Sequence, residues 1–90
     1  MLIALDYDFT YTEDPSLWDS FIDLATSKGH SIICVTMRYE NEGIILKRTI
    51  GKKCEIVFTG RKAKLNFLKE LNIEPDVWID DTPKWIYEDA

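Results

Sequence analysis

A four-residue apolar run, Leu2-Ile3-Ala4-Leu5, leads directly into two closely spaced carboxylates, Asp6 and Asp8. The run is too short for a helix and too continuous for a strand with one face in water, so it predicts a buried strand of a parallel sheet. Ligands of open α/β sheets bind outside the carboxyl ends of the strands, where these two aspartates are expected. Because the two carboxylates repel each other, they favour a hard divalent cation such as Mg²⁺.

The same residues begin a D-x-D-x-T pattern that also opens calcium-binding EF-hand loops. Such a loop needs glycine at its sixth position and glutamate at its twelfth, where this chain has Tyr11 and Leu17. An EF-hand is therefore excluded. A strand end with two solvated carboxylates remains the alternative at this point.

The chain has 90 residues, which predicts a single, nearly minimal domain spanning 1–90, without room for a large lid. No window reaches the length of a membrane span, and no basic leader precedes the first strand, so we expect no membrane partner and a cytoplasmic location. Cys34 and Cys54 lack metal-binding spacing and are expected to be core thiols.

Further apolar runs predict strands at residues 32–35, 55–58 and 77–79. Asp14 and Pro15 are an N-cap and a first helical residue, and Gly29 is the matching stop, so a helix is expected between them. Two more helices are predicted at about 41–51 and 63–71, and a short one around Trp85 and Ile86. Apolar residues recur at helical spacing in the first of these helices, at Leu17, Trp18, Phe21, Ile22 and Ala25. The second helix carries Ile44, Ile45 and Leu46, and the third shows Leu65, Leu68 and Leu71 on one face.

This βαβαβαβα order predicts an α/β fold, a three-layer α/β/α Rossmann-like parallel sheet. Each predicted strand is followed by polar side chains, which would meet at one edge of that sheet. This coincidence predicts a functional site. The side chains are Asp6 and Asp8, then Thr36 and Arg38, then Arg61, Lys62 and Lys64, and last Asp80 and Asp81.

Four segments, DYDFT, VTMR, the lysine that opens the third long helix, and WIDD, resemble the motifs of the haloacid dehalogenase (HAD) superfamily of phosphotransferases, in the family's order. The resemblance covers almost the whole chain and implies a minimal HAD-like fold without a cap domain. It also implies that Asp6 is a nucleophile that accepts the phosphoryl group, and that Asp8 is the general acid and base.

By the same resemblance, Asp6, the main-chain carbonyl of Asp8 and Asp80 would hold Mg²⁺, and Asp81 is either a further ligand or an outer support. Thr36 and one lysine would bind the phosphoryl oxygens. Lys64 is the favoured lysine, and Lys62 is the alternative.

Two neighbouring residues have less definite roles. Thr10 is expected to shape the turn after the nucleophile more than to take part in chemistry. Arg38 either binds a substrate anion or forms an ion pair with Glu40 or Glu42.

The sequence departs from the family pattern at Phe9, where glycine is frequent, and in its very short segment 10–14. Without a cap, the site would admit a bulky phosphate carrier, and Arg38, Arg61 and Lys62 would favour a polyanion such as a nucleic-acid or nucleotide end. The charge is uneven as well, at net +7 for residues 47–69 and −12 elsewhere. That asymmetry is typical of either an anion-binding face or a solvated helix surface.

The predicted function is therefore a Mg²⁺-dependent phosphomonoesterase. The alternative is a HAD-like module that binds a phosphate or phosphoprotein with little or no turnover. A phosphoacceptor receiver domain is disfavoured, because it would carry its acceptor aspartate on a middle strand and its lysine on the last. Tyr7, Phe9 and Tyr11 flank Asp6 and Asp8, either as apolar neighbours or as a surface for base stacking.

Overall fold

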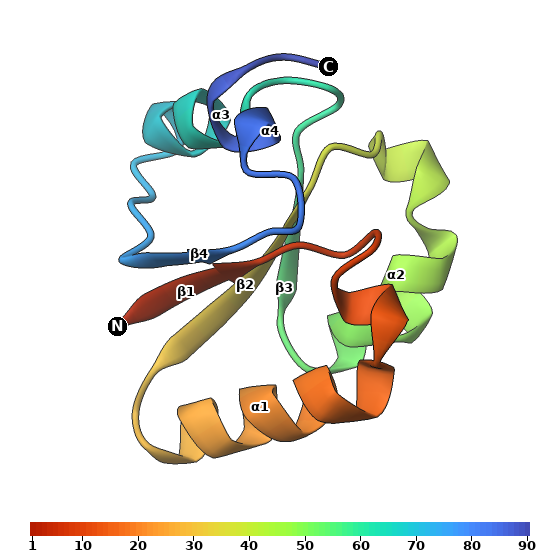
Figure 1. The fold of residues 1–90 in the computed structure, drawn as a ribbon, viewed down its shortest axis with the longest axis vertical. Coiled ribbons are helices and arrows are strands. Elements are labelled where there is room, and N and C mark those ends of the chain that lie inside the picture. The colour runs from red at the N-terminus through yellow and green to blue at the C-terminus, as the bar shows by residue number, and fades with distance from the viewer.

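A computed structural model describes all residues from 1 to 90. It contains one sheet of four parallel strands in the order β3-β2-β1-β4 (Figure 1). The strands are β1 (Leu2–Leu5), β2 (Ser31–Thr36), β3 (Glu55–Phe58) and β4 (Val77–Ile79). The predicted parallel α/β architecture with four strands is confirmed.

Helices cover both faces of this sheet. Helices α1 (Pro15–Ser27) and α2 (Ile44–Arg48) pack on one face, while α3 (Lys64–Glu70) and α4 (Lys84–Tyr87) lie on the other and contact each other (Figure 1). No helix has the length and apolar character needed to cross a bilayer.

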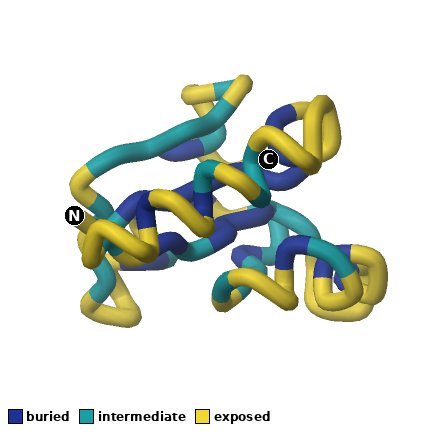
Figure 2. The backbone as a smooth tube through the Cα atoms, turned by 90° about the horizontal axis from the view of Figure 1, so that it is seen from below, coloured by how far each residue is buried: buried dark blue, intermediate teal, exposed yellow.

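Strand β1 is at the centre of the core because it pairs with β2 on one side and β4 on the other. Ile3 and Leu5 face a larger apolar cluster under α1 and α2, and Ala4 faces a smaller one under α3. The buried segments form a continuous band through the middle of the molecule (Figure 2). The apolar run is therefore buried on both faces, as its composition predicts.

Helix α1 begins and ends where its capping residues predict. Asp14 accepts a hydrogen bond from the backbone N–H of Leu17 at 3.2 Å, and Gly29 adopts a φ of 87° after the last turn. Ile22 and Ala25 are buried, whereas Leu17, which belongs to the same helical spacing, is 54% exposed.

The single helix predicted for 41–51 is wrong, because this segment is divided into three short pieces. Two 3₁₀ turns, Glu40–Glu42 and Ile50–Lys52, flank α2. Gly43 lies so close to the Phe58 ring that a side chain would not fit there. Within the broken segment Leu46 is buried, but Ile44 and Ile45 are exposed, so only one of the three apolar residues of the predicted helix enters the core.

Helix α3 also buries less of its predicted apolar face. Leu68 is fully buried, but the helix ends at Glu70, and Leu71 beyond it is 50% exposed. Asn72 then turns the chain with a φ of 59°. Leu71 is therefore not a core residue, because its position on the helical face is lost once the helix stops.

Candidate functional site at the carboxyl ends of the strands

The parallel sheet brings the polar residues that follow its strands to one edge, which we call the site edge. Strands β1 and β4 are neighbours, so Asp6 after β1 and Asp80 after β4 are adjacent, and the backbone N–H of Asp6 donates to the carbonyl oxygen of Ile79 at 2.9 Å. Strand β2 flanks β1 on the other side and ends at Thr36.

Lys64 is the central cation of the site edge. Its side chain is 3% exposed, and its Nζ lies 2.8 Å from Asp6 Oδ1 and 2.6 Å from Asp80 Oδ2. Lys62, by contrast, is exposed and borders a separate groove next to Asp89. Of the two candidate lysines, Lys64 is therefore the one that reaches the carboxylates.

Thr10 links two of these carboxylates. Its hydroxyl oxygen lies 3.1 Å from Asp6 Oδ2 and 3.2 Å from Asp81 Oδ1, and it accepts a hydrogen bond from the backbone N–H of Asp81. Because the hydroxyl has one proton, it donates to one carboxylate at a time. Thr10 thus fixes the turn after β1 against the loop after β4, the role that the sequence favours.

The site edge combines buried charges of both signs, and this changes their pKa values. Burial raises the pKa of Asp6 from 3.8 to about 7, although the nearby Lys64 ammonium opposes this shift. Burial alone would lower the pKa of Lys64, but its ion pairs with Asp6 and Asp80 outweigh that effect and raise it. Asp81 has a lowered pKa despite partial burial, because of its contact with Asp6 and the hydrogen bonds from Thr82 and Thr10.

Three carboxylates form a group that suits a divalent cation. Oxygen atoms of Asp6, Asp80 and Asp81 all lie within 4.8 Å of one another. Carboxylate oxygens are the hard ligands that Mg²⁺ takes in proteins, so the donor set fits this ion. The Asp8 carboxylate is not part of the group. The only Mg²⁺ ligand that Asp8 would contribute is its main-chain carbonyl, as the resemblance implies.

The Asp8 carboxylate is engaged elsewhere, in a two-point ion pair with Arg38. Arg38 Nη2 donates to Asp8 Oδ1 at 2.8 Å and Nε donates to Oδ2 at 3.0 Å. The guanidinium also lies 5.5 Å from the centre of the Tyr7 ring, and Nη1 donates to the carbonyl oxygen of Glu42 at 2.9 Å. The expected ion pair of Arg38 with Glu40 or Glu42 is wrong, because the partner is Asp8.

Two further predicted site residues lie next to this pair. Thr36 is buried, and its hydroxyl accepts a hydrogen bond from the backbone N–H of Arg38 at 3.2 Å. Arg61 donates to the carbonyl oxygen of Met37 at 2.7 Å and to Glu42 at 3.2 Å. Arg38 and Arg61 are both neutralised by carboxylates of the chain itself, which removes the free positive charge on which the expectation of a polyanion depended.

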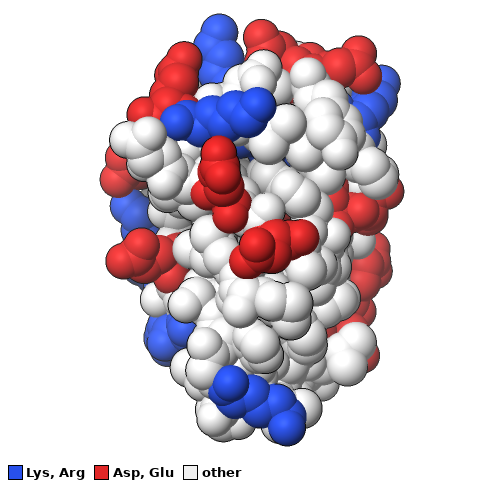
Figure 3. Space-filling model, turned by 90° about the vertical axis from the view of Figure 1, so that its left-hand side faces the viewer, with Lys and Arg blue, Asp and Glu red and all other residues white.

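Half of the basic residues of segment 47–69 are neutralised in the same way. Of its eight basic residues, four form ion pairs with acidic residues outside the segment; these four are Lys47, Lys53, Arg61 and Lys64. On the face drawn in Figure 3, lysine and arginine side chains are dispersed among carboxylates and uncharged atoms, without a continuous basic patch. The uneven sequence charge therefore does not collect into one anion-binding face there.

The three aromatic residues around the two aspartates differ in exposure. Tyr7 and Tyr11 are buried and stack on each other with ring centres 5.5 Å apart, so they are apolar neighbours within the core. Phe9 is 71% exposed and has a φ of 62°, the left-handed conformation that favours glycine. The motif that this stretch resembles frequently has glycine at this position, which is the sequence signal for that conformation.

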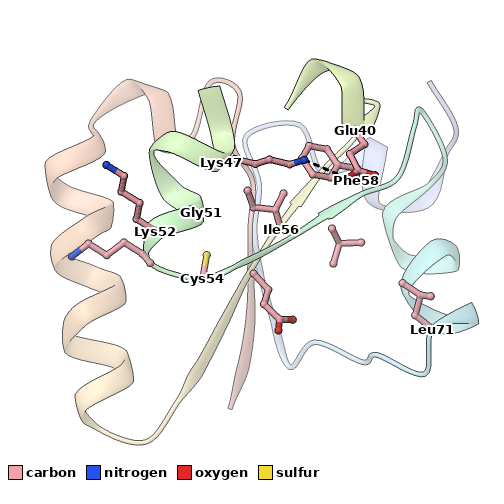
Figure 4. A pocket seen from close by; sticks show the side chains of 11 residues that line it. Glu40, Lys47, Gly51, Lys52, Cys54, Ile56, Phe58 and Leu71 are labelled. Carbon is pink, nitrogen blue, oxygen red and sulfur yellow. Dashed lines mark hydrogen bonds and ion pairs between the residues drawn. The ribbon is translucent and has the colours of Figure 1, made fainter. Parts of the chain in front are cut away.

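The most voluminous groove, about 810 Å³, lies along the free edge of β3 and contains none of the site residues (Figure 4). Lys52 and Leu71 lie at opposite ends of the group of residues drawn, and Lys47, which pairs with Glu40, lies beside Phe58 between them. This groove is therefore separate from the carboxylate group.

Comparisons of the chain with models of protein families, with curated proteins and with solved structures found no match.

Proposed function

We propose that the chain is a HAD-like, Mg²⁺-dependent phosphomonoesterase that works through an aspartyl-phosphate intermediate. The observation that carries the proposal is the buried contact of Lys64 with both Asp6 and Asp80. A buried cation in contact with a nucleophilic carboxylate, with Asp80 and Asp81 beside it, would stabilise the charge on a phosphoryl group transferred to that carboxylate.

In the first step, an Asp6 carboxylate oxygen attacks phosphorus as the bond from phosphorus to the leaving oxygen breaks, and Asp8 transfers a proton to that oxygen. In the second step, Asp8, now ionised, takes a proton from water, whose oxygen attacks the aspartyl phosphate. Inorganic phosphate leaves and Asp6 is restored. Lys64 and Thr36 would compensate the charge on the phosphoryl oxygens.

Mg²⁺, when bound by Asp6, Asp80 and Asp81 with the Asp8 carbonyl, would supply positive charge between the anionic nucleophile and the anionic phosphate. The chain itself contributes the orientation of these oxygens, through Lys64 and Thr10. The Asp8 side chain is 40% exposed, so a substrate carried by something bulky can approach it.

The test is an assay of acetyl phosphate and an aryl phosphate with purified protein, with Mg²⁺ and with a chelator. Asp6→Asn and Asp8→Asn keep the shape of the side chains and remove their charge, and Lys62→Met is the matched control for Lys64→Met. We expect Mg²⁺-dependent release that is lost in Asp6→Asn, Asp8→Asn and Lys64→Met and kept in Lys62→Met. No release by the wild-type protein, or equal release by Asp6→Asn, would contradict the proposal.

One observation favours a second candidate, a phosphate-binding module with little turnover. Both oxygens of the Asp8 carboxylate accept hydrogen bonds from Arg38, and a residue held in this way is not available to a leaving group until the pair opens. Mg²⁺-dependent binding of phosphate in calorimetry, without release from either substrate, would support this candidate over the enzyme.

A further inference from the structure

A second groove, of about 380 Å³, begins directly at the carboxylate group. Its apolar wall is formed by Phe9, Leu17, Trp18 and Ile79, and its exposed lining is mostly apolar. Asp80 and Asp81 border the same groove. An apolar surface therefore continues from the place where we propose that the phosphoryl group is transferred.

The wall of this groove is held in place by a hydrogen bond. The indole N–H of Trp18 donates to the carbonyl oxygen of Thr10 at 2.9 Å, which fixes the start of α1 against the turn that carries Phe9. The Trp18 ring also packs edge-on against Phe21, with ring centres 5.7 Å apart. The groove is thus a built feature of the fold and not a gap between mobile side chains.

Phe9 is held in a costly conformation at this wall. It has a φ of 62°, which disfavours residues with a Cβ, and the residue is 71% exposed. Leu17, across the groove, is 54% exposed. Neither the backbone strain nor the two exposed apolar side chains stabilise the folded state, so a binding role accounts for them better than packing does.

The charges around the groove exclude an anionic occupant. Glu13 and Asp14 line it together with Asp80 and Asp81, and no basic residue does. The two arginines of the site edge are already paired, Arg38 with Asp8 and Arg61 with Glu42. The groove therefore suits a group that is apolar and either uncharged or cationic.

We propose that this groove binds the aromatic part of the substrate's leaving alcohol, so that the substrate is a phosphomonoester of an aromatic alcohol. This inference rests on the proposed function and adds its substrate class. An aromatic ring would lie against Phe9 and Leu17, while its phosphate reaches Asp6.

The experiment compares three substrates in Mg²⁺: 1-naphthyl phosphate, acetyl phosphate, which has no aromatic part, and a phosphorylated oligonucleotide end. The variants are Phe9→Ala and Leu17→Ala, both at exposed positions, with Leu24→Ala as the matched control, because Leu24 is equally exposed on α1 but does not line the groove. Thermal unfolding checks that each variant is folded.

We expect kcat/KM of the wild-type protein to be higher for 1-naphthyl phosphate than for the phosphorylated oligonucleotide end. We expect Phe9→Ala and Leu17→Ala each to raise the ratio of KM for 1-naphthyl phosphate to KM for acetyl phosphate about tenfold, the loss of one apolar contact. Leu24→Ala should leave the ratio unchanged.

Three outcomes would contradict the inference. The first two apply when acetyl phosphate is hydrolysed, and they overturn the aromatic subsite alone. One is a ratio of the two KM values that Phe9→Ala and Leu17→Ala leave unchanged. The other is a higher kcat/KM for the oligonucleotide end than for 1-naphthyl phosphate. No hydrolysis of any of the three substrates overturns the proposed function, and this inference with it.

Discussion

Lys64 shows how a single residue determines the electrostatics of this protein. Its ammonium is buried with the carboxylates of Asp6 and Asp80, both of which are also poorly exposed. Buried charges are tolerated when they are paired, and removing one partner leaves the others uncompensated. The stability of the site edge therefore depends on this one cation.

Replacement of Lys64 by methionine, which keeps the length of the side chain, should lower the free energy of unfolding by roughly 3 to 5 kcal/mol, as breaking a buried pair does. Urea unfolding in a chelator measures this loss. The Mg²⁺ that we propose would supply positive charge to the same carboxylates, so adding it should stabilise the variant more than the wild type. Lys62→Met is the control and should stay within about 0.5 kcal/mol of the wild type.

The raised pKa of Asp6 predicts a pH dependence in metal-free protein. The folded state holds the proton of Asp6 up to about pH 7, whereas the unfolded chain loses it near 3.8, so this contribution to stability is present below pH 4 and is lost as the pH rises to about 7. Each pKa unit corresponds to about 1.4 kcal/mol. Urea unfolding in a chelator from pH 4 to 8 should show this fall. It should be absent in Asp6→Asn, and an equal fall in that variant would assign it to other groups.

The left-handed conformation of Phe9 predicts an unusual order of stability among its variants. A residue with a Cβ in this conformation costs about 1 to 2 kcal/mol, which glycine avoids, while the exposed ring contributes little packing. Thermal unfolding should therefore rank Phe9→Gly above Phe9→Ala by about 1 kcal/mol. An alanine variant as stable as the glycine variant would mean that the turn after β1 carries no strain.

At the scale of elements, the strands were predictable because each contains a short apolar run, which is mostly buried in β1 and β2 and half-buried in the edge strands β3 and β4. Segment 40–52 was not, because its residues have helical spacing, yet α2 is only five residues long and lies between two 3₁₀ turns. With the helix broken, Leu46 is buried while its neighbour Ile45 is 49% exposed. The spacing of apolar residues along the sequence does not predict which of them this segment buries.

Helix α2 should accordingly depend on Leu46 and hardly on Ile45. Leu46→Ala removes a fully buried side chain and should cost about 2 to 5 kcal/mol. Ile45→Ala on the same helix should cost less than about 1 kcal/mol, since that side chain is half in water. Denaturant unfolding of the two variants measures the difference, and comparable losses would show that both side chains are buried in solution.

The site was predictable in part for the same reason. Parallel strands must bring Asp6 and Asp80 to one edge, so this shared location followed from the strand pattern, whereas their contact depends on the pairing of β1 with β4. The partner of Arg38 did not follow, because Asp8 lies 30 residues away and Glu40 and Glu42 are nearer in sequence. The groove beside Phe9 depends on how α1 packs against the turn after β1, which no motif encodes.

For the molecule as a whole, the reactivity of its two cysteine thiols measures how well the fold protects its core from solvent. Burial raises the pKa of Cys34 far above its usual range and that of Cys54 to about 11. Thiolates are the reactive form, so both cysteines should react slowly with a chromogenic aromatic disulfide at pH 8 and at once in denaturant. In Cys54→Ser, labelling of Cys34 should be limited by global unfolding, since this residue is fully buried on the central strand pair. Rapid labelling of native Cys54→Ser would contradict this burial.

The two chain ends lie on different sides of the molecule (Figure 1). Met1 precedes β1 at the end of the sheet away from the site edge, where its amino group lies 2.9 Å from His30 Nδ1, while the backbone N–H of Ala90 donates to the carbonyl oxygen of Arg61 at 2.8 Å. A surface or fusion partner attached through the amino terminus would therefore leave the carboxylates facing outward. Attachment through the carboxyl terminus would begin beside the loop that leads into Lys64 and would be the poorer choice for immobilising the protein in an assay.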